Sequence, residues 1–275
     1  MHQTIIPEQK NLCLTCGTKL KGNYCSHCGE KKLNPTADYS IHKFIEQSVD
    51  GFTHFDSKFL RSFRALLFKP GLLTVEFIHG RRMRYMKPVQ IFIIASVLFY
   101  FFFPKASTFF APVAQLQLNN RFGFNATKVV QDKATADSTT THLIIKAAET
   151  EAVHKSKAYL FILIPFWGLL FYLLFWRSNP FLVPHVILAA HSLSFFIVLF
   201  MIYYPVMMLV GLKKFGDNEL ILMAVIFLTY LFFSIKRVYQ QSIFLSLVKS
   251  ILALLAFMTL FATYREGITI WVLST

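Results

Sequence analysis

The chain has 275 residues, of which 55% are hydrophobic and 31 are phenylalanine, and its mean hydropathy is +0.50. This composition excludes an ordinary soluble domain and is typical of an integral membrane protein. In a soluble chain the formal net charge of +14 would favour nucleic-acid binding. Here much of the positive charge borders apolar segments, where it sets topology and meets anionic headgroups, so we expect membrane lipids as partners and rank nucleic acid last.

Two CxxCG knuckles near the start of the chain predict a metal site. The cysteines are Cys13, Cys16, Cys25 and Cys28. In each knuckle a glycine follows the second cysteine and permits a positive φ, so two such turns can close a four-thiolate cage suited to Zn²⁺. A closed cage has no open position for a substrate, so we expect a structural zinc ribbon over residues 1–34. Redox thiols and ligation by His27 are the alternatives.

Four lysines surround the knuckles. They are Lys19, Lys21, Lys31 and Lys32. They could meet phosphate or an acidic protein partner, or they could simply be solvated. No apolar signal segment precedes the cysteines, so we expect this head on the reducing, cytoplasmic side, where metal binding explains paired thiols better than disulfides.

Residues 35–87 are expected to form basic amphipathic helices, at 41–49, 56–68 and 72–78. Such helices beside a first span are typical of elements that lie in the inner membrane interface. Packing against cytoplasmic loops of the same protein is the alternative. His54 and Asp56, two residues apart, form a candidate cytoplasmic polar site, although Asp56 could equally cap a helix.

A cationic cluster stands directly before the first long apolar run. Arg81, Arg82 and Arg84 are its arginines, and they predict that the N-terminus stays in the cytoplasm. Arginines can also hold a lipid phosphate or another anion through forked hydrogen bonds. A role as topology determinants alone is the simpler interpretation.

Residues 88–275 are predicted to form an all-α transmembrane bundle of about five helices. The expected spans are residues 88–103, 158–176, 185–212, 219–235 and 243–264. The first, at ~24 Å, is shorter than the roughly 30 Å hydrocarbon core. Residues 104–157 become an outer loop and the C-terminus lies outside. Pro165 and Pro205 are expected to kink their spans.

Polar side chains inside spans are costly and are therefore candidate functional residues. They are His185, His191 and Lys249. His191 and Lys249 lie at a similar depth from the inner face and could line one inward-facing cavity. Ordinary structural roles compete with this idea, because Lys249 could extend to the headgroups and His191 could hydrogen-bond a neighbouring helix.

The pattern Phe52, Phe55, Asp56, then Lys69-Pro70-Gly71, then Glu76 to Pro88, resembles a bacterial family catalogued as domain of unknown function 3667. With the paired knuckles, the resemblance runs from Cys13 to about Tyr100. It implies a bacterial inner membrane and a zinc-ribbon head, and it carries no established activity.

The sequence shows no Gly-rich phosphate loop, GxSxG, HExxH or acidic pair within a span, so it leans away from an enzyme. Our leading hypothesis is a scaffolding protein whose zinc head recruits a protein partner. The alternative is a small transporter or membrane enzyme that handles a lipid or small anion near His191 and Lys249.

Overall fold

The computed structural model describes residues 11–34, 58–103, 125–209 and 217–275, and the single positions 38, 40 and 42. Regular secondary structure in these residues is helical, which confirms the all-α prediction. The helices are α3 (Lys58–Phe68), α4 (Leu72–Ile78), α5 (Pro88–Phe102), α7 (Ala126–Ala136), α8 (Thr141–Tyr159), η2 (Leu160–Ile162), α9 (Leu163–Phe175), α10 (Leu182–Leu209), α11 (Asp217–Tyr239) and α12 (Ile243–Ser274). The expected helix at 41–49 lies outside the described residues.

Three helices in the described part of the chain are long and apolar enough to cross a membrane, which indicates a membrane protein. They cover Leu182–Met207, Glu219–Tyr239 and Ile243–Ser274. A fourth is present if the broken pair Thr141–Ser156 and Leu160–Phe175 is one span. The structure thus has three or four candidate spans where the sequence predicted about five. The difference is α5, whose 15 residues extend only about 22 Å, less than the roughly 30 Å core.

The break before α9 has a local cause in Pro165. We expected this proline in the middle of a span, but it lies in the first turn of α9, directly after the 3-10 turn η2. Proline has no N–H and its ring clashes with the carbonyl four residues earlier, so it is tolerated at a helix start and disrupts a helix interior. Pro205, in contrast, is inside α10 as predicted.

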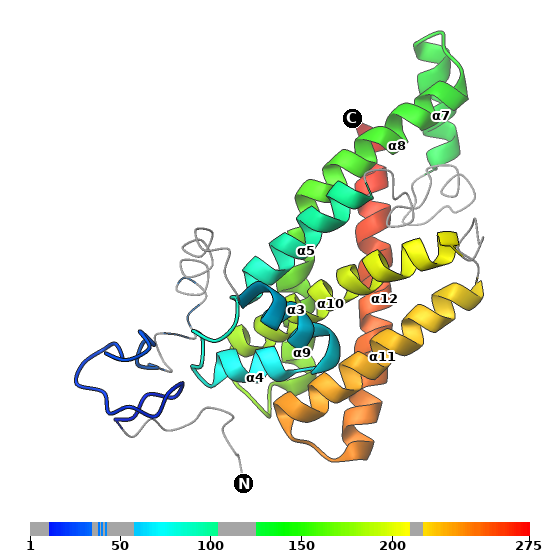
Figure 1. Cartoon of the computed structure of the whole chain (residues 1–275). Coiled ribbons are helices and arrows are strands. Elements are labelled where there is room, and N and C mark those ends of the chain that lie inside the picture. The colour runs from blue at the N-terminus through cyan, green and yellow to red at the C-terminus, as the bar shows by residue number, and fades with distance from the viewer. Residues whose placement is uncertain are drawn as a thin grey trace. The chain divides into compact units, whose positions relative to one another are not determined.

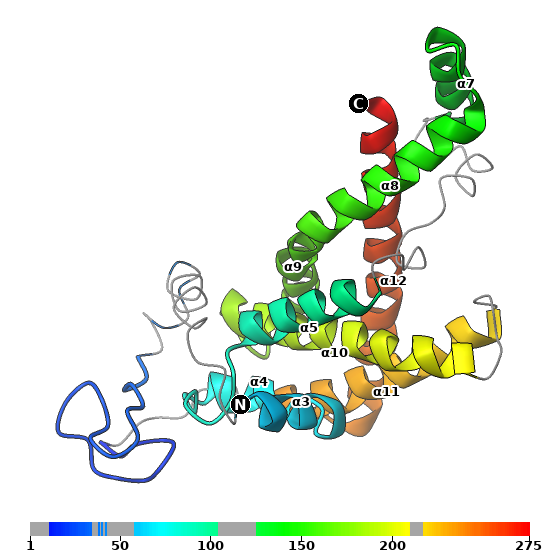
Figure 2. The ribbon, with the colours of Figure 1, turned by 45° about the horizontal axis from the view of Figure 1, so that its top comes forward.

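The chain divides into two compact units, and the first comprises residues 1–99 and 164–255. Within it, the short helix α4 packs against α3, α10 and α11 (Figures 1 and 2). Its side chains Leu73, Phe77 and Ile78 are buried. The sequence left open a helix in the membrane interface or one packed against cytoplasmic loops of the same protein. Helix α4 packs within the protein, against other helices of this unit.

Tight backbone packing seats the start of α4 on α11. Gly71 has φ +74°, and a Cβ there would lie 2.9 Å from both Cα and the carbonyl oxygen of Ser234. One residue earlier, the Pro70 carbonyl accepts a 2.6 Å hydrogen bond from Arg237 Nη1. The sequence Lys69-Pro70-Gly71 is therefore a close-packed joint between α4 and α11.

Aromatic contacts join the longer helices of this unit. The Phe195 ring of α10 stacks on Tyr230 of α11 with centroids 3.8 Å apart, and Phe99 of α5 meets Phe200 of α10 edge-on at 5.9 Å. Trp167 Nε1 in α9 donates a 2.8 Å hydrogen bond to Ser192 Oγ in α10. Large flat side chains therefore join α5 and α9 to α10, and α10 to α11.

The second unit comprises residues 100–163 and 256–275. Part of the expected outer loop is helical here, because α7 and α8 pack on the C-terminal part of α12 (Figure 1). Their shared apolar cluster is Val130, Ala148, Ala152, Ile268, Val272 and Leu273. Tyr264 donates a 2.7 Å hydrogen bond to the Ser156 carbonyl. With this cover, α12 continues to Ser274, where the sequence predicted a span ending at residue 264.

Candidate metal centre and its attachment to the helices

The two cysteine knuckles have the same backbone structure, repeated twelve positions later. The Cys13 N–H donates to the Thr18 carbonyl, and the Cys25 N–H donates to the Glu30 carbonyl, each at 2.8 Å. Gly17 and Gly29 take φ values of +76° and +73°, in the left-handed region that glycine occupies without strain. The glycines therefore do what the sequence pattern predicted, and each turns its knuckle back toward the other.

The four thiols form one cluster, with all sulfur atoms within 4.8 Å of one another. Cys13 Sγ lies 3.5 Å from Cys28 Sγ, and Cys16 Sγ lies 3.5 Å from Cys25 Sγ. A tetrahedral metal with ligand bonds of about 2.3 Å has sulfur atoms about 3.8 Å apart, so the cage is close to the size required. His27 is exposed and does not belong to the cluster.

The environments of the thiols differ. Hydrogen bonding to the side chain and backbone of Thr18 lowers the pKa of Cys16 to about 5. Burial raises the pKa of Cys28 to about 12 and also raises the pKa of Cys13. Burial thus disfavours the thiolate forms of Cys13 and Cys28, and a bound cation would favour them.

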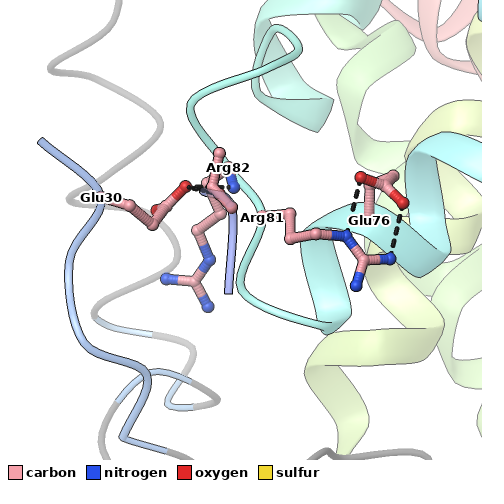
Figure 3. Close-up of polar contacts among 5 residues, drawn as sticks. Glu30, Glu76, Arg81 and Arg82 are labelled. Atoms are coloured by element: carbon pink, nitrogen blue, oxygen red, sulfur yellow. Dashed lines mark hydrogen bonds and ion pairs between the residues drawn. The ribbon is translucent and has the colours of Figure 1, made fainter. Parts of the chain in front are cut away.

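Glu30 attaches the head to the helices. Its carboxylate is buried, and Oε2 accepts hydrogen bonds from the backbone N–H groups of Arg82 and Met83, at 2.8 and 2.9 Å. The Thr15 hydroxyl donates to the same oxygen at 2.8 Å. Figure 3 shows Glu30 reaching from the head to the chain at Arg82. This charged acceptor joins both knuckles to the loop between α4 and α5, and so fixes the head to the helices.

Gly80 forms the opposite side of the attachment. It ends α4 in a Schellman motif, because the Arg81 N–H bonds the Glu76 carbonyl and the Gly80 N–H bonds the Phe77 carbonyl. Its φ is +76°, and a Cβ there would lie 3.1 Å from Leu14 and 3.3 Å from Leu33, both in the head. Only glycine satisfies the turn and the close approach together.

Two of the three predicted anion-binding arginines are used within the protein. Arg81 Nε and Nη2 donate to the two carboxylate oxygens of Glu76 at 2.9 and 2.6 Å, and this pairing raises the pKa of Arg81 (Figure 3). The Arg82 guanidinium lies 4.8 Å from the Phe77 ring centroid and 3.9 Å from Asp38 Oδ2. Arg84 is exposed, with its guanidinium 5.7 Å from the ring centroid of Tyr85.

Replacing Glu30 by Ala is expected to loosen this attachment. Two backbone N–H groups lose a charged acceptor, which should cost about 2–4 kcal/mol of local stability. Amide hydrogen exchange of the full chain, followed in peptides that contain Arg82 and Met83, should become faster. Glu30→Gln retains an oxygen acceptor and should show a smaller change. Equal exchange in wild type and Glu30→Ala would contradict the assignment, and Lys21→Ala, at an exposed position, serves as the control.

Comparison with known proteins finds a family match that includes the loop between α4 and α5. Residues 56–100 match the family "Protein of unknown function (DUF3667)". The predicted resemblance is therefore confirmed over this segment, which begins downstream of the knuckles, whereas we expected it to begin at Cys13. No match was found among curated proteins or among solved structures.

The DUF3667 segment contains both joints of α4. At one end Pro70 and Gly71 fit against α11, and at the other Gly80, Arg81 and Arg82 meet the head. The residues at these two joints therefore have structural roles.

The two histidines of α10 have separate hydrogen-bonding partners. His191 Nδ1 lies 2.8 Å from Thr74 Oγ1 of α4, with both side chains buried, and its Nε2 has no partner in the described part of the chain. His185 Nε2 lies 3.0 Å from the Asn179 carbonyl, to which it must donate. Its Nδ1 therefore accepts from the Tyr239 hydroxyl, 2.7 Å away.

Lys249 lies against an aromatic cluster. Its Nζ is 4.3 Å from the Phe175 ring centroid, and Phe175 stacks on Tyr239 with centroids 3.8 Å apart. Because Tyr239 also bonds His185, the contacts connect Lys249 with His185. The contacts of His191 and Lys249 thus go to different partners, and the other predicted polar pair, His54 and Asp56, lies outside the described residues.

Replacing Thr74 by Val should destabilise the bundle, because it leaves both ring nitrogens of His191 without a partner in a buried site. We expect a loss of about 1–3 kcal/mol. The double variant Thr74→Val/His191→Leu should recover most of it, because removing both polar partners avoids the unpaired group. Thermal unfolding of the purified protein in detergent measures the cycle. Additive losses in the double variant would show that the two side chains do not interact.

Sequence reasoning missed two residues that matter here. Glu30 had a detectable signal, because aligning the two knuckles gives it the position equivalent to Thr18. A carboxylate where the other repeat has a small hydroxyl suggests a different contact. Thr74 had none, since its partner is 117 positions away in the sequence.

Proposed function

We propose that this protein is a multi-pass scaffold of the bacterial inner membrane, in which a Zn²⁺-bound cytoplasmic head serves as a fixed platform for a protein partner. The observation that carries the proposal is the Glu30 carboxylate bound to the Arg82 and Met83 amides. A head held in this way presents the same surface at a defined position, which reduces the ordering cost of binding a partner.

General chemical principles support Zn²⁺ as the metal and the cytoplasm as the location of the N-terminus in this proposal. Four sulfur ligands in a closed, near-tetrahedral cage favour Zn²⁺ over the oxygen-seeking cations. The cluster Arg81, Arg82 and Arg84 directly before α5 favours a cytoplasmic N-terminus.

The exposed side chains of the head have features of a protein-binding surface. Leu12 and Tyr24 occupy equivalent positions in the two knuckles and are 51% and 64% exposed. Exposed Lys19 and Lys21 lie in the same segment. Apolar anchors beside cations suit an acidic protein partner. The separate contacts of His191 and Lys249 make the transporter or enzyme alternative the weaker proposal.

The test is site-specific photo-crosslinking in cells with the full chain. A crosslinking residue at Tyr24 should give a defined protein adduct, identified by mass spectrometry, that disappears when Cys13→Ser removes a metal ligand. The same residue at Leu143, which is 55% exposed on α8, is the control. Absence of an adduct beyond that control, or an adduct that survives Cys13→Ser, would refute the platform proposal.

A further inference from the structure

The outward face of α3 combines apolar and cationic side chains. Leu60 and Phe68 are 75% and 76% exposed, and Arg61 and Arg64 are exposed between them. At about 100° per residue these four positions fall within an arc of about 100°. A helix that exposes large apolar side chains beside arginines is typical of a membrane surface.

The orientation of this face is fixed by the opposite side of α3. Ser62, Ala65 and Leu66 are buried, and α3 packs against α4 and α10. The Ser62 hydroxyl oxygen accepts a 2.9 Å hydrogen bond from the Met86 N–H. Because α10 is a candidate span in the same unit, α3 is held beside a helix long and apolar enough to cross a membrane.

In the described part of the chain, no carboxylate neutralises the arginines of this face. The sequence of α3 contains three cations and no acid. Among the residues that the structure describes, neither Arg61 nor Arg64 has a carboxylate partner, whereas Arg81 and Arg82 each have one within 4 Å. Within the described residues, Arg61 and Arg64 are therefore open to an external anion, whereas Arg81 and Arg82 are paired.

We propose that the α3 face formed by Leu60, Arg61, Arg64 and Phe68 binds anionic phospholipid headgroups. Arg61 and Arg64 donate hydrogen bonds to lipid phosphate oxygens, and Leu60 and Phe68 enter the boundary between headgroups and acyl chains. The cationic character selects an anionic lipid over a zwitterionic one. This site acts independently of the proposed protein partner, because it lies on α3 and not on the head.

The proposal is tested by lipid titration of the full, metal-loaded protein in detergent, with thermal unfolding as the readout. Phosphatidylglycerol should raise the unfolding temperature at a lower concentration than phosphatidylcholine. In Arg61→Gln/Arg64→Gln the phosphatidylglycerol midpoint should rise about tenfold. Arg61→Lys/Arg64→Lys should retain most of the preference. Lys128→Gln/Lys146→Gln, which removes two exposed charges from α7 and α8, should leave it unchanged.

Two further arms separate the possible occupants. Inorganic phosphate alone should not reproduce the stabilisation, because it cannot engage Leu60 and Phe68. A photo-crosslinker at Phe68 in a phosphatidylglycerol bilayer should label lipid. Identical titrations for wild type and Arg61→Gln/Arg64→Gln would overturn the proposal. Labelling of a second copy of the chain or of another protein would also overturn it.

Discussion

Removing the metal from the four-cysteine cluster should unfold residues 11–34 and release Glu30 from the Arg82 and Met83 amides. The segment buries almost no apolar side chain besides its cysteines and Leu33, so it has no hydrophobic core of its own. Structural Zn²⁺ in comparable peptides contributes roughly 10–16 kcal/mol of apparent binding free energy, and this is folding free energy. Elemental analysis should find one zinc ion per chain, and Cys13→Ser should lose it.

The consequence for the helices can be measured separately. After chelation or in Cys13→Ser, amide exchange should accelerate both in the knuckles and at Arg82 and Met83, while α10 and α11 keep their protection. Lys21→Ser, at an exposed position of the same segment, is the matched control and should retain zinc. A head that keeps its exchange protection after complete metal removal would show that the cluster is not a structural metal site.

Gly71→Ala is expected to be the most destabilising single-methyl substitution in the helical part. A residue with a Cβ pays about 1–2 kcal/mol to hold φ near +74°. The new Cβ also lies 2.9 Å from two backbone atoms of Ser234, which cannot rotate away. Overpacking of this kind adds about 1–3 kcal/mol, so we expect a total loss of about 2–5 kcal/mol in thermal or denaturant unfolding.

Two other glycines separate the contributions to that loss. Gly17 has φ +76°, and a methyl group added there would meet nothing within 4 Å, so Gly17→Ala should show the backbone strain without the clash. Gly267 lies within α12, in open space and without a positive φ, so Gly267→Ala should be neutral or slightly stabilising. If Gly71→Ala were no worse than Gly17→Ala, α4 would not be seated against α11 as described.

The proposed lipid binding by α3 and the proposed platform role of the head can be tested separately. Among the described residues, no hydrogen bond or ion pair joins Arg61 or Arg64 to the knuckles, or Tyr24 to α3. Loss of lipid preference without loss of the Tyr24 adduct would therefore remove one proposal and leave the other.

Local features determined what the sequence could predict. Helix α4 ends where its capping residues stand, with Gly71 before Leu72 and Gly80 after His79, and the predicted bounds 72–78 match the structure. The cysteine cluster follows from two CxxCG turns that each need only a few neighbouring residues. The apolar helices follow from runs long enough to span lipid, and α5 falls short by the same length arithmetic.

Tertiary contacts decided the rest. Only packing shows that α4 is buried and that Arg81 and Arg82 pair with carboxylates of the same chain. It also shows that Glu30 bonds the loop before α5, and that α7 and α8 cover the C-terminal part of α12. These features join residues far apart in the chain, such as Glu30 with Arg82 and Thr74 with His191. Residue spacing along one segment is enough to predict turns, caps and apolar faces. The partner of a buried polar group depends instead on which distant segment the fold brings beside it.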